Sequence, residues 1–156
     1  MNLRLAPLAL LLALAACTPR NIPGTEIPES PDTVAIAQLL AAYRTALEKL
    51  DAPGVLALAA PDYYDIAGTP DPSDDVDYTR LQQRLPADLA AIDSMQLDFT
   101  LRKIDVQGDR ATAEVYFESN YRVKTPSGAT VPHRDADMHR LALRRVENAW
   151  RITSGL

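Results

Sequence analysis

The segment ALEKLDAPGVLALAAPDYYDI, residues 46–66, joins the end of one helical pattern to the start of another. Asp51 precedes Pro53 by two positions, an arrangement typical of a helix start, because the carboxylate accepts free backbone amides and proline needs no amide partner in the first turn. We therefore predict that a first helix ends near Asp51 and that Asp51 caps a second, short helix. The chain then leaves the helix within residues 61–70.

Helical patterns extend in both directions from this segment. Upstream, Ser30 followed by Pro31 predicts a helix start, and apolar residues recur at steps of four and three: Ile36, Leu40, Tyr43, Leu47 and Leu50. Downstream, an acidic, proline-broken loop leads to a third helical pattern, which Pro86 kinks or restarts: Tyr78, Leu81, Leu85, Leu89 and Ile92.

Beyond Ser94 the hydrophobic period changes from helical spacing to two. Met95, Leu97, Phe99 and Leu101 share one face, and a change of phase predicts a bulge near residues 102–103. Turn signals follow at residues 108–109, 126–128 and 147–148. Helices followed by an antiparallel meander predict an α+β domain with the helices on one face of the sheet.

Two segments carry a resemblance to a known superfamily. Residues 46–66 resemble the opening of the nuclear transport factor 2-like (NTF2-like) superfamily, which includes SnoaL-like and ketosteroid-isomerase-like domains, and LALRRVENAWRITSG, residues 141–155, is similar to its last hairpin. The resemblance covers about residues 32–156 and implies a cone-shaped fold. In that fold a bent antiparallel sheet wraps around a long N-terminal helix, two further helices are present, and a pocket lies at the open end. The superfamily includes isomerases, dehydratases and domains without known activity, so fold does not determine function.

The N-terminus predicts export and lipid anchoring. Residues 1–16 carry Arg4 and then an apolar run from Leu5 to Ala16, which is too short to span a bilayer and is typical of a signal peptide. LAAC, residues 14–17, resembles a bacterial lipobox, and Cys17 is the single cysteine of the chain. We expect Cys17 to be lipidated. The four prolines of the following residues predict an extended tether from 17 to 31, after which the domain of residues 32–156 begins.

This anchor places the protein in the cell envelope, with the membrane as a partner. The residue after the cysteine is Thr18 rather than aspartate, which by the same resemblance favours the periplasmic face of the outer membrane. Loss of Arg4 with the signal peptide leaves 15 basic against 21 acidic residues, a net charge near −6. This balance argues against a nucleic-acid partner and against electrostatic adsorption to anionic lipid.

Residues 133–139, HRDADMH, contain both histidines of the chain. Because alternate residues of a strand share a face, His133, Asp135, Asp137 and His139 lie on the same face as Leu141. The two histidines would be about 20 Å apart along the strand, too far to share one metal ion. We therefore expect no metal site. We also expect no cofactor. We also expect Asp137 and His139 to be partly buried at a pocket mouth, with His133 and Asp135 in water.

The resemblance implies candidate site residues. Asp137 and His139 could act as base and acid, with Tyr43 and Tyr121 as hydroxyl donors. The set of candidates that could line a pocket comprises Tyr43, Tyr64, Phe117, Tyr121, Asp137 and His139. No glycine-rich phosphate loop or nucleophile elbow is present in the sequence.

Three functions remain open from the sequence. The first is an envelope lipoprotein whose domain binds a small apolar molecule or an envelope protein without catalysis. The second is an isomerase- or dehydratase-type enzyme that uses Asp137 and His139. The third is a structural domain of an envelope assembly, and a homodimer formed through the sheet face is a further possibility.

Overall fold

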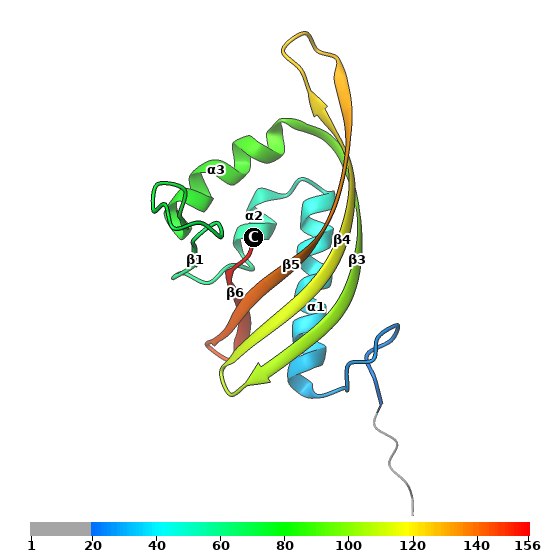
Figure 1. Cartoon of the computed structure of the whole chain (residues 1–156), viewed down its shortest axis with the longest axis vertical. Coiled ribbons are helices and arrows are strands. Elements are labelled where there is room, and N and C mark those ends of the chain that lie inside the picture. The colour runs from blue at the N-terminus through cyan, green and yellow to red at the C-terminus, as the bar shows by residue number, and fades with distance from the viewer. Residues whose placement is uncertain (1–19) are drawn as a thin grey trace, which may run out of the picture.

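The computed structural model describes residues 20–156. The predicted signal peptide and Cys17 lie outside the described residues. The described chain is α+β, with three helices, a two-stranded β-ladder and a four-stranded antiparallel sheet (Figure 1). In chain order the elements are α1 (Pro31–Glu48), α2 (Ala52–Leu56), β1 (Tyr64–Asp65), β2 (Val76–Asp77), α3 (Tyr78–Ala90), β3 (Ile92–Gln107), β4 (Arg110–Lys124), β5 (Thr130–Val146) and β6 (Ala149–Ser154).

The predicted start of α1 is confirmed. The Ser30 side chain accepts a hydrogen bond from the Thr33 amide at 3.1 Å, and the Thr33 hydroxyl accepts one from the Ser30 amide at 2.8 Å. This reciprocal cap satisfies two amides that a helix start otherwise leaves unpaired. The face of α1 that includes Ile36, Leu40 and Tyr43 is buried against the sheet, so α1 forms the centre of the core.

Asp51 caps α2, as its position before Pro53 predicts. Its carboxylate accepts a hydrogen bond from the Gly54 amide at 3.0 Å. A Cβ atom at residue 54 would collide with this carboxylate, so the cap requires glycine at that position. Val55 follows on the inner side of α2 and is fully buried. The short helix therefore turns the chain sharply while it contributes to the core.

α3 begins at an Asp77 cap and passes through Pro86 without ending. Leu81 and Leu89 are buried on its inner side. Ile92 is already the first residue of β3, so the helix ends two residues earlier than its hydrophobic pattern predicts. Ile92 is half-buried at this boundary.

The sheet has strand order β3-β4-β5-β6 and curves around α1 (Figure 1). The predicted bulge is confirmed as a shift of register between Leu101 and Lys103. Glu147 and Asn148, in the turn between β5 and β6, both have positive φ angles, as a tight two-residue hairpin requires. Strand β6 pairs only with Ala142–Val146, so the preceding part of β5 extends beyond it as a projecting hairpin with β4.

The described part of the predicted tether is not an extended segment. Residues 20–29 form a turn, in which Glu29 donates a backbone hydrogen bond to Arg20 at 2.7 Å and Asn21 bridges Pro28. Ile27 is buried in this turn. The prolines are compatible with this shape because the turn places Gly24, at a φ of 77°, between them.

No helix within residues 20–156 combines the length and the apolar character needed to cross a bilayer.

Candidate functional site

A cavity of about 150 Å³ lies between α1 and the concave face of the sheet. Its walls are mostly apolar and come from one helix and three neighbouring strands. The residues that line it are Tyr43 and Leu47 of α1, Met95, Leu97 and Phe99 of β3, Val115, Phe117, Ser119 and Tyr121 of β4, and His139 and Leu141 of β5.

Strand register explains why these residues meet. Phe99 pairs with Phe117, and Val115 pairs with His139, so each pair shares a face of the sheet. Every second residue along each strand then joins the same face. The alternating pattern of β3 and β4 therefore builds a continuous apolar wall opposite α1.

Tyr43 brings a polar group into this apolar cavity. Its side chain is 8% exposed and its ring lies 5.9 Å from the ring of Phe99, measured between centroids. Burial raises the pKa of Tyr43 to about 12, so the phenol stays protonated at physiological pH. Among residues 20–156, the Tyr43 hydroxyl has no hydrogen-bond partner, and it can therefore donate to a bound molecule.

His139 also lines the cavity. It is half-buried, and its ring meets the Phe117 ring edge-on with 4.3 Å between centroids. Within the described chain, neither imidazole nitrogen makes a hydrogen bond. The prediction that His139 lies partly buried next to Leu141 is confirmed.

Asp137 does not share this environment. It is exposed and does not line the cavity, so the prediction that it is partly buried is wrong. Its carboxylate accepts a hydrogen bond from the next amide, that of Met138, at 2.7 Å. Asp135 makes the same contact with the amide of Ala136 at 2.9 Å. Both amides thus have a partner although β6 ends before it reaches them.

These contacts give HRDADMH a structural role along most of its length. An unpaired strand edge is a site of aggregation, and inward-pointing charges and proline protect such edges. Asp135 and Asp137 are on the inward side of the projecting part of β5, with Pro132 near its start. His133 is exposed and stacks on Tyr121 with 5.3 Å between ring centroids. We infer that this stretch mainly protects a strand edge and contributes only His139 to the cavity.

Of the three remaining candidate pocket residues, two line the cavity and one does not. Phe117 and Tyr121 line the cavity together with Tyr43 and His139. Tyr64 does not: it lies on β1, is 52% exposed and donates its hydroxyl proton to Asp75. That hydrogen bond, which only the protonated phenol can donate, raises the pKa of Tyr64.

The sequence did not identify Leu47, Val115, Ser119 and Leu141 as cavity residues, nor the three β3 side chains. The alternation of Met95, Leu97 and Phe99 was the available signal, because it places all three on the face that wraps the helix. Which part of that face stays uncovered depends on where α1 ends against the sheet. Glu48, at the end of α1, fixes this point by accepting a hydrogen bond from the Leu97 amide at 3.1 Å.

A half-buried carboxylate outside the cavity, that of Asp65, holds the end of β6 in place. Burial alone would raise the pKa of Asp65, but hydrogen bonds from the amides of Gly155 and Ala67 and from the Ser154 and Tyr63 hydroxyls outweigh it and lower the pKa. Burial raises the pKa of Tyr63, whose hydroxyl accepts a hydrogen bond from the Leu156 amide at 3.0 Å. All of these groups are used in holding the chain, so we assign them a structural role.

No group of three histidine, cysteine, aspartate or glutamate side chains in residues 20–156 is arranged to hold a metal ion.

Comparison with protein-family models and with curated protein sequences gives no match. Solved structures do match. A Streptomyces avermitilis protein of the NTF2-like family, proposed to be a dehydratase, aligns with a TM-score of 0.65 at 16% identity, covering 80% of this chain and 95% of its own. A ketosteroid isomerase-like protein from Erwinia carotovora atroseptica aligns with a TM-score of 0.65 at 18% identity, covering 81% and 94%.

A third structure, a Novosphingobium aromaticivorans protein proposed to be a scytalone dehydratase, aligns with a TM-score of 0.66 at 13% identity, covering 79% of this chain and 80% of its own. The described chain therefore has the NTF2-like fold, as the sequence predicts. At these identities the likeness concerns the fold alone, and the function must be argued from the cavity.

Proposed function

We propose that this domain binds a small, compact, mostly apolar molecule that carries one hydrogen-bonding oxygen, and that it does so without converting the molecule. The observation that supports this proposal is the apolar cavity between α1 and the sheet, which Tyr43 lines with a side chain whose hydroxyl makes no hydrogen bond with residues 20–156. An apolar wall supplies affinity, and a small number of polar groups orient the ligand.

The size of the cavity narrows the ligand class. Drug-sized ligands occupy pockets of about 300–1,000 Å³, whereas apolar cavities of about 150 Å³ hold single molecules the size of benzene. The cavity described here belongs to the smaller group. A single six-membered ring with one carbonyl or hydroxyl oxygen is the chemistry that matches it.

Tyr43 and His139 would hold that oxygen in different ways. The raised pKa of Tyr43 keeps its proton in place, so it can donate a hydrogen bond to a carbonyl oxygen. The imidazole of His139 can donate or accept according to its tautomer, and it can therefore also serve a hydroxyl group. The other lining groups are mostly apolar.

An isomerase- or dehydratase-type enzyme is the second candidate. Two observations favour it: His139 and Tyr43 line the same cavity, and two of the similar structures are proteins proposed to be dehydratases. Such chemistry needs a base and an acid that both reach the substrate. The exposed position of Asp137 leaves His139 without the carboxylate that the sequence suggested as its partner. For this reason we favour binding over catalysis.

We further propose that lipidated Cys17 anchors the domain in the cell envelope, at the periplasmic face of the outer membrane. The sequence LAAC and the absence of aspartate after it support this location. A partner protein of the envelope, or a structural role without a ligand, would leave the cavity unused.

A pair of matched probes tests the binding proposal. Cyclohexanone carries one acceptor oxygen, and methylenecyclohexane has the same shape without it. We expect both to bind, and Tyr43→Phe to weaken cyclohexanone binding about 3- to 10-fold, the effect of one hydrogen bond, while leaving methylenecyclohexane binding unchanged. Tyr64→Phe, on the exposed β1 strand, is the control and should change neither. Failure of both probes to bind would contradict the proposal, and turnover of a cyclic ketone that His139→Ala abolishes would favour the enzyme.

A further inference from the structure

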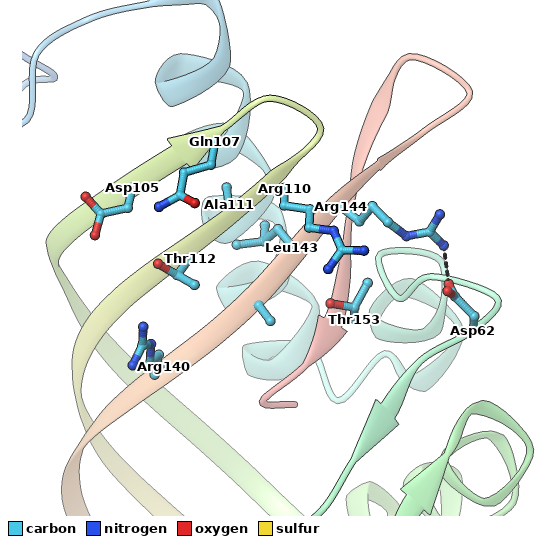
Figure 2. A pocket seen from close by; sticks show the side chains of 11 residues that line it. Asp62, Asp105, Gln107, Arg110, Ala111, Thr112, Arg140, Leu143, Arg144 and Thr153 are labelled. Carbon is cyan, nitrogen blue, oxygen red and sulfur yellow. Dashed lines mark hydrogen bonds and ion pairs between the residues drawn. The ribbon is translucent and has the colours of Figure 1, made fainter.

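A second hollow, of about 500 Å³, lies on the outer face of the sheet, opposite to the apolar cavity. Three arginines, Arg110, Arg140 and Arg144, line it (Figure 2). They lie on β4 and β5, two adjacent strands of the sheet. A concentration of guanidinium groups is unexpected on a chain with a net charge of −5.

Strand register creates the hollow. Arg110 pairs directly with Arg144, and two residues further along the strands Thr112 pairs with Ala142. Arg140 follows after two more residues, so it lies about 13 Å from Arg144 along β5. The small side chains of Thr112 and Ala142 form a low floor between long arginines. Figure 2 shows Thr112 on β4, with Arg140 and Arg110 lying apart from each other around it.

The charges of the hollow are only partly balanced. Arg144 pairs with Asp62 at 2.5 Å, and Asp105 pairs with Lys103 at 2.6 Å. Arg110 and Arg140 form no ion pair and no side-chain hydrogen bond with residues 20–156. Glu114 pairs with Arg140 in the strand register, but it does not reach salt-bridge distance.

The direct pairing of Arg110 with Arg144 is unfavourable in the free protein. Like charges opposite each other on neighbouring strands destabilise a sheet. An anion between such side chains removes the repulsion and gains charge-assisted hydrogen bonds from guanidinium groups. The hydroxyls of Thr112 and Thr153, which also line the hollow, make no hydrogen bond with the described residues and can contribute further donors.

We propose that this hollow binds an elongated small molecule with an anionic group, a carboxylate or a phosphate, at each end. One anionic group binds at Arg110, beside Arg144, and the other at Arg140. The neutral middle of the molecule lies over Thr112 and Ala142. Arg110 and Arg140, which have no ion-pair partner within residues 20–156, match a ligand with two negative charges, and the distance between them sets the length of ligand that can reach both.

Titration calorimetry on the full-length chain in non-ionic detergent tests this assignment. The probes are suberate and hexane-1,6-diyl bisphosphate, which carry an anionic group at each end, hexanoate, which carries one, and malonate, which is short. We expect saturable binding of at least one long dianion, at least about tenfold tighter than hexanoate or malonate, because one charge-assisted contact is lost with either of them. Comparison of the two long dianions distinguishes a carboxylate ligand from a phosphate ligand.

Matched variants complete the test. Arg110→Gln and Arg140→Gln should each weaken binding of the long dianion at least about fivefold, whereas Arg84→Gln, on the exposed side of α3, should change it less than twofold. Equal losses in all three variants would mean unspecific charge attraction and would overturn the proposal. So would equal binding of hexanoate and the long dianions, or an absence of saturation. A concentration-dependent dimer in sedimentation that Arg140→Gln abolishes would assign the face to a second copy of the chain and would equally overturn it.

Discussion

Two buried tyrosines, Tyr43 and Tyr63, should respond in opposite ways to the loss of one hydroxyl group. Both side chains are nearly inaccessible, at 8% and 2% exposure. The Tyr63 hydroxyl accepts a hydrogen bond from the Leu156 amide at 3.0 Å and donates one to Asp65 at 3.3 Å. Tyr43 lines the cavity, and its hydroxyl has no hydrogen-bond partner in the described chain.

The magnitudes follow from these contacts. Tyr63→Phe leaves the Leu156 amide and the Asp65 carboxylate each short of one partner, and we expect it to lower the free energy of unfolding by about 1–3 kcal/mol. Tyr43→Phe removes a hydroxyl that costs free energy to bury and gains no protein hydrogen bond in return. We expect it to change stability by less than about 0.5 kcal/mol or to raise it by up to about 1 kcal/mol.

Urea unfolding of the two variants measures this difference, provided that the slope of unfolding free energy against urea concentration is the same for both.

The pH dependence of stability provides a second readout for Tyr43. Because its pKa is raised to about 12 in the folded protein, the unfolded chain loses this proton first. The contribution of protonated Tyr43 to the free energy of unfolding is therefore fully present below about pH 10, and it declines as the pH rises towards 12. Tyr43→Phe should remove that decline. A loss of more than about 1 kcal/mol in Tyr43→Phe at neutral pH would show that the hydroxyl has a structural partner, and our reasoning about the cavity would fail.

Three further predictions concern other parts of the chain. Because the pKa of Asp65 is lowered in the folded protein, its carboxylate stabilises the fold above the pKa it has in the unfolded chain, and this stabilisation is lost as the pH falls through the folded value. Asp65→Asn should therefore destabilise the protein at pH 7 and make its stability depend less on pH in the acid range. Replacing Asp135 and Asp137 together by valine should expose a pairing-competent strand edge and cause concentration-dependent association in size-exclusion chromatography, whereas Asp88→Val on α3 should leave the protein unchanged. Cys17→Ser should leave an unlipidated precursor, visible by mass; recovery of wild-type protein with a free Cys17 thiol would contradict the anchor.

The sequence predicts the elements of this fold well, because each has a local physical cause. The Ser30 and Asp51 caps, the bulge at residue 102 and the turn at residues 147–148 follow from the chemistry of a few neighbouring residues. The alternation of side chains along a strand, counted from Leu141, likewise predicts correctly which residues of β5 share the inner face.

This alternation does not show how far the core extends along a strand. Asp137 shares a face with His139 but lies beyond the region that α1 and β6 cover, so it is exposed. Tyr64 belongs to the short β1–β2 ladder, and no hydrophobic periodicity in the sequence predicts where this ladder lies. The positions of Asp137 and Tyr64 depend on tertiary contacts, which local patterns do not contain. The turn at residues 20–29 is closed by backbone hydrogen bonds and by the Thr25 hydroxyl, which accepts a hydrogen bond from the Ile27 amide and donates one to the Ile22 carbonyl, whereas the prolines of this segment indicated an extended chain.

The position of cyclohexanone in the protein tests the central claim most directly. With the methyl groups labelled with carbon-13, nuclear Overhauser contacts locate the ligand among the side chains. We predict contacts from cyclohexanone to the methyls of Leu47, Val115 and Leu141, all of which line the cavity, and none to Leu58, which lies outside it. Saturable binding without contacts to these three residues, or contacts to Leu58 alone, would contradict the claim that the cavity between α1 and the sheet is the binding site.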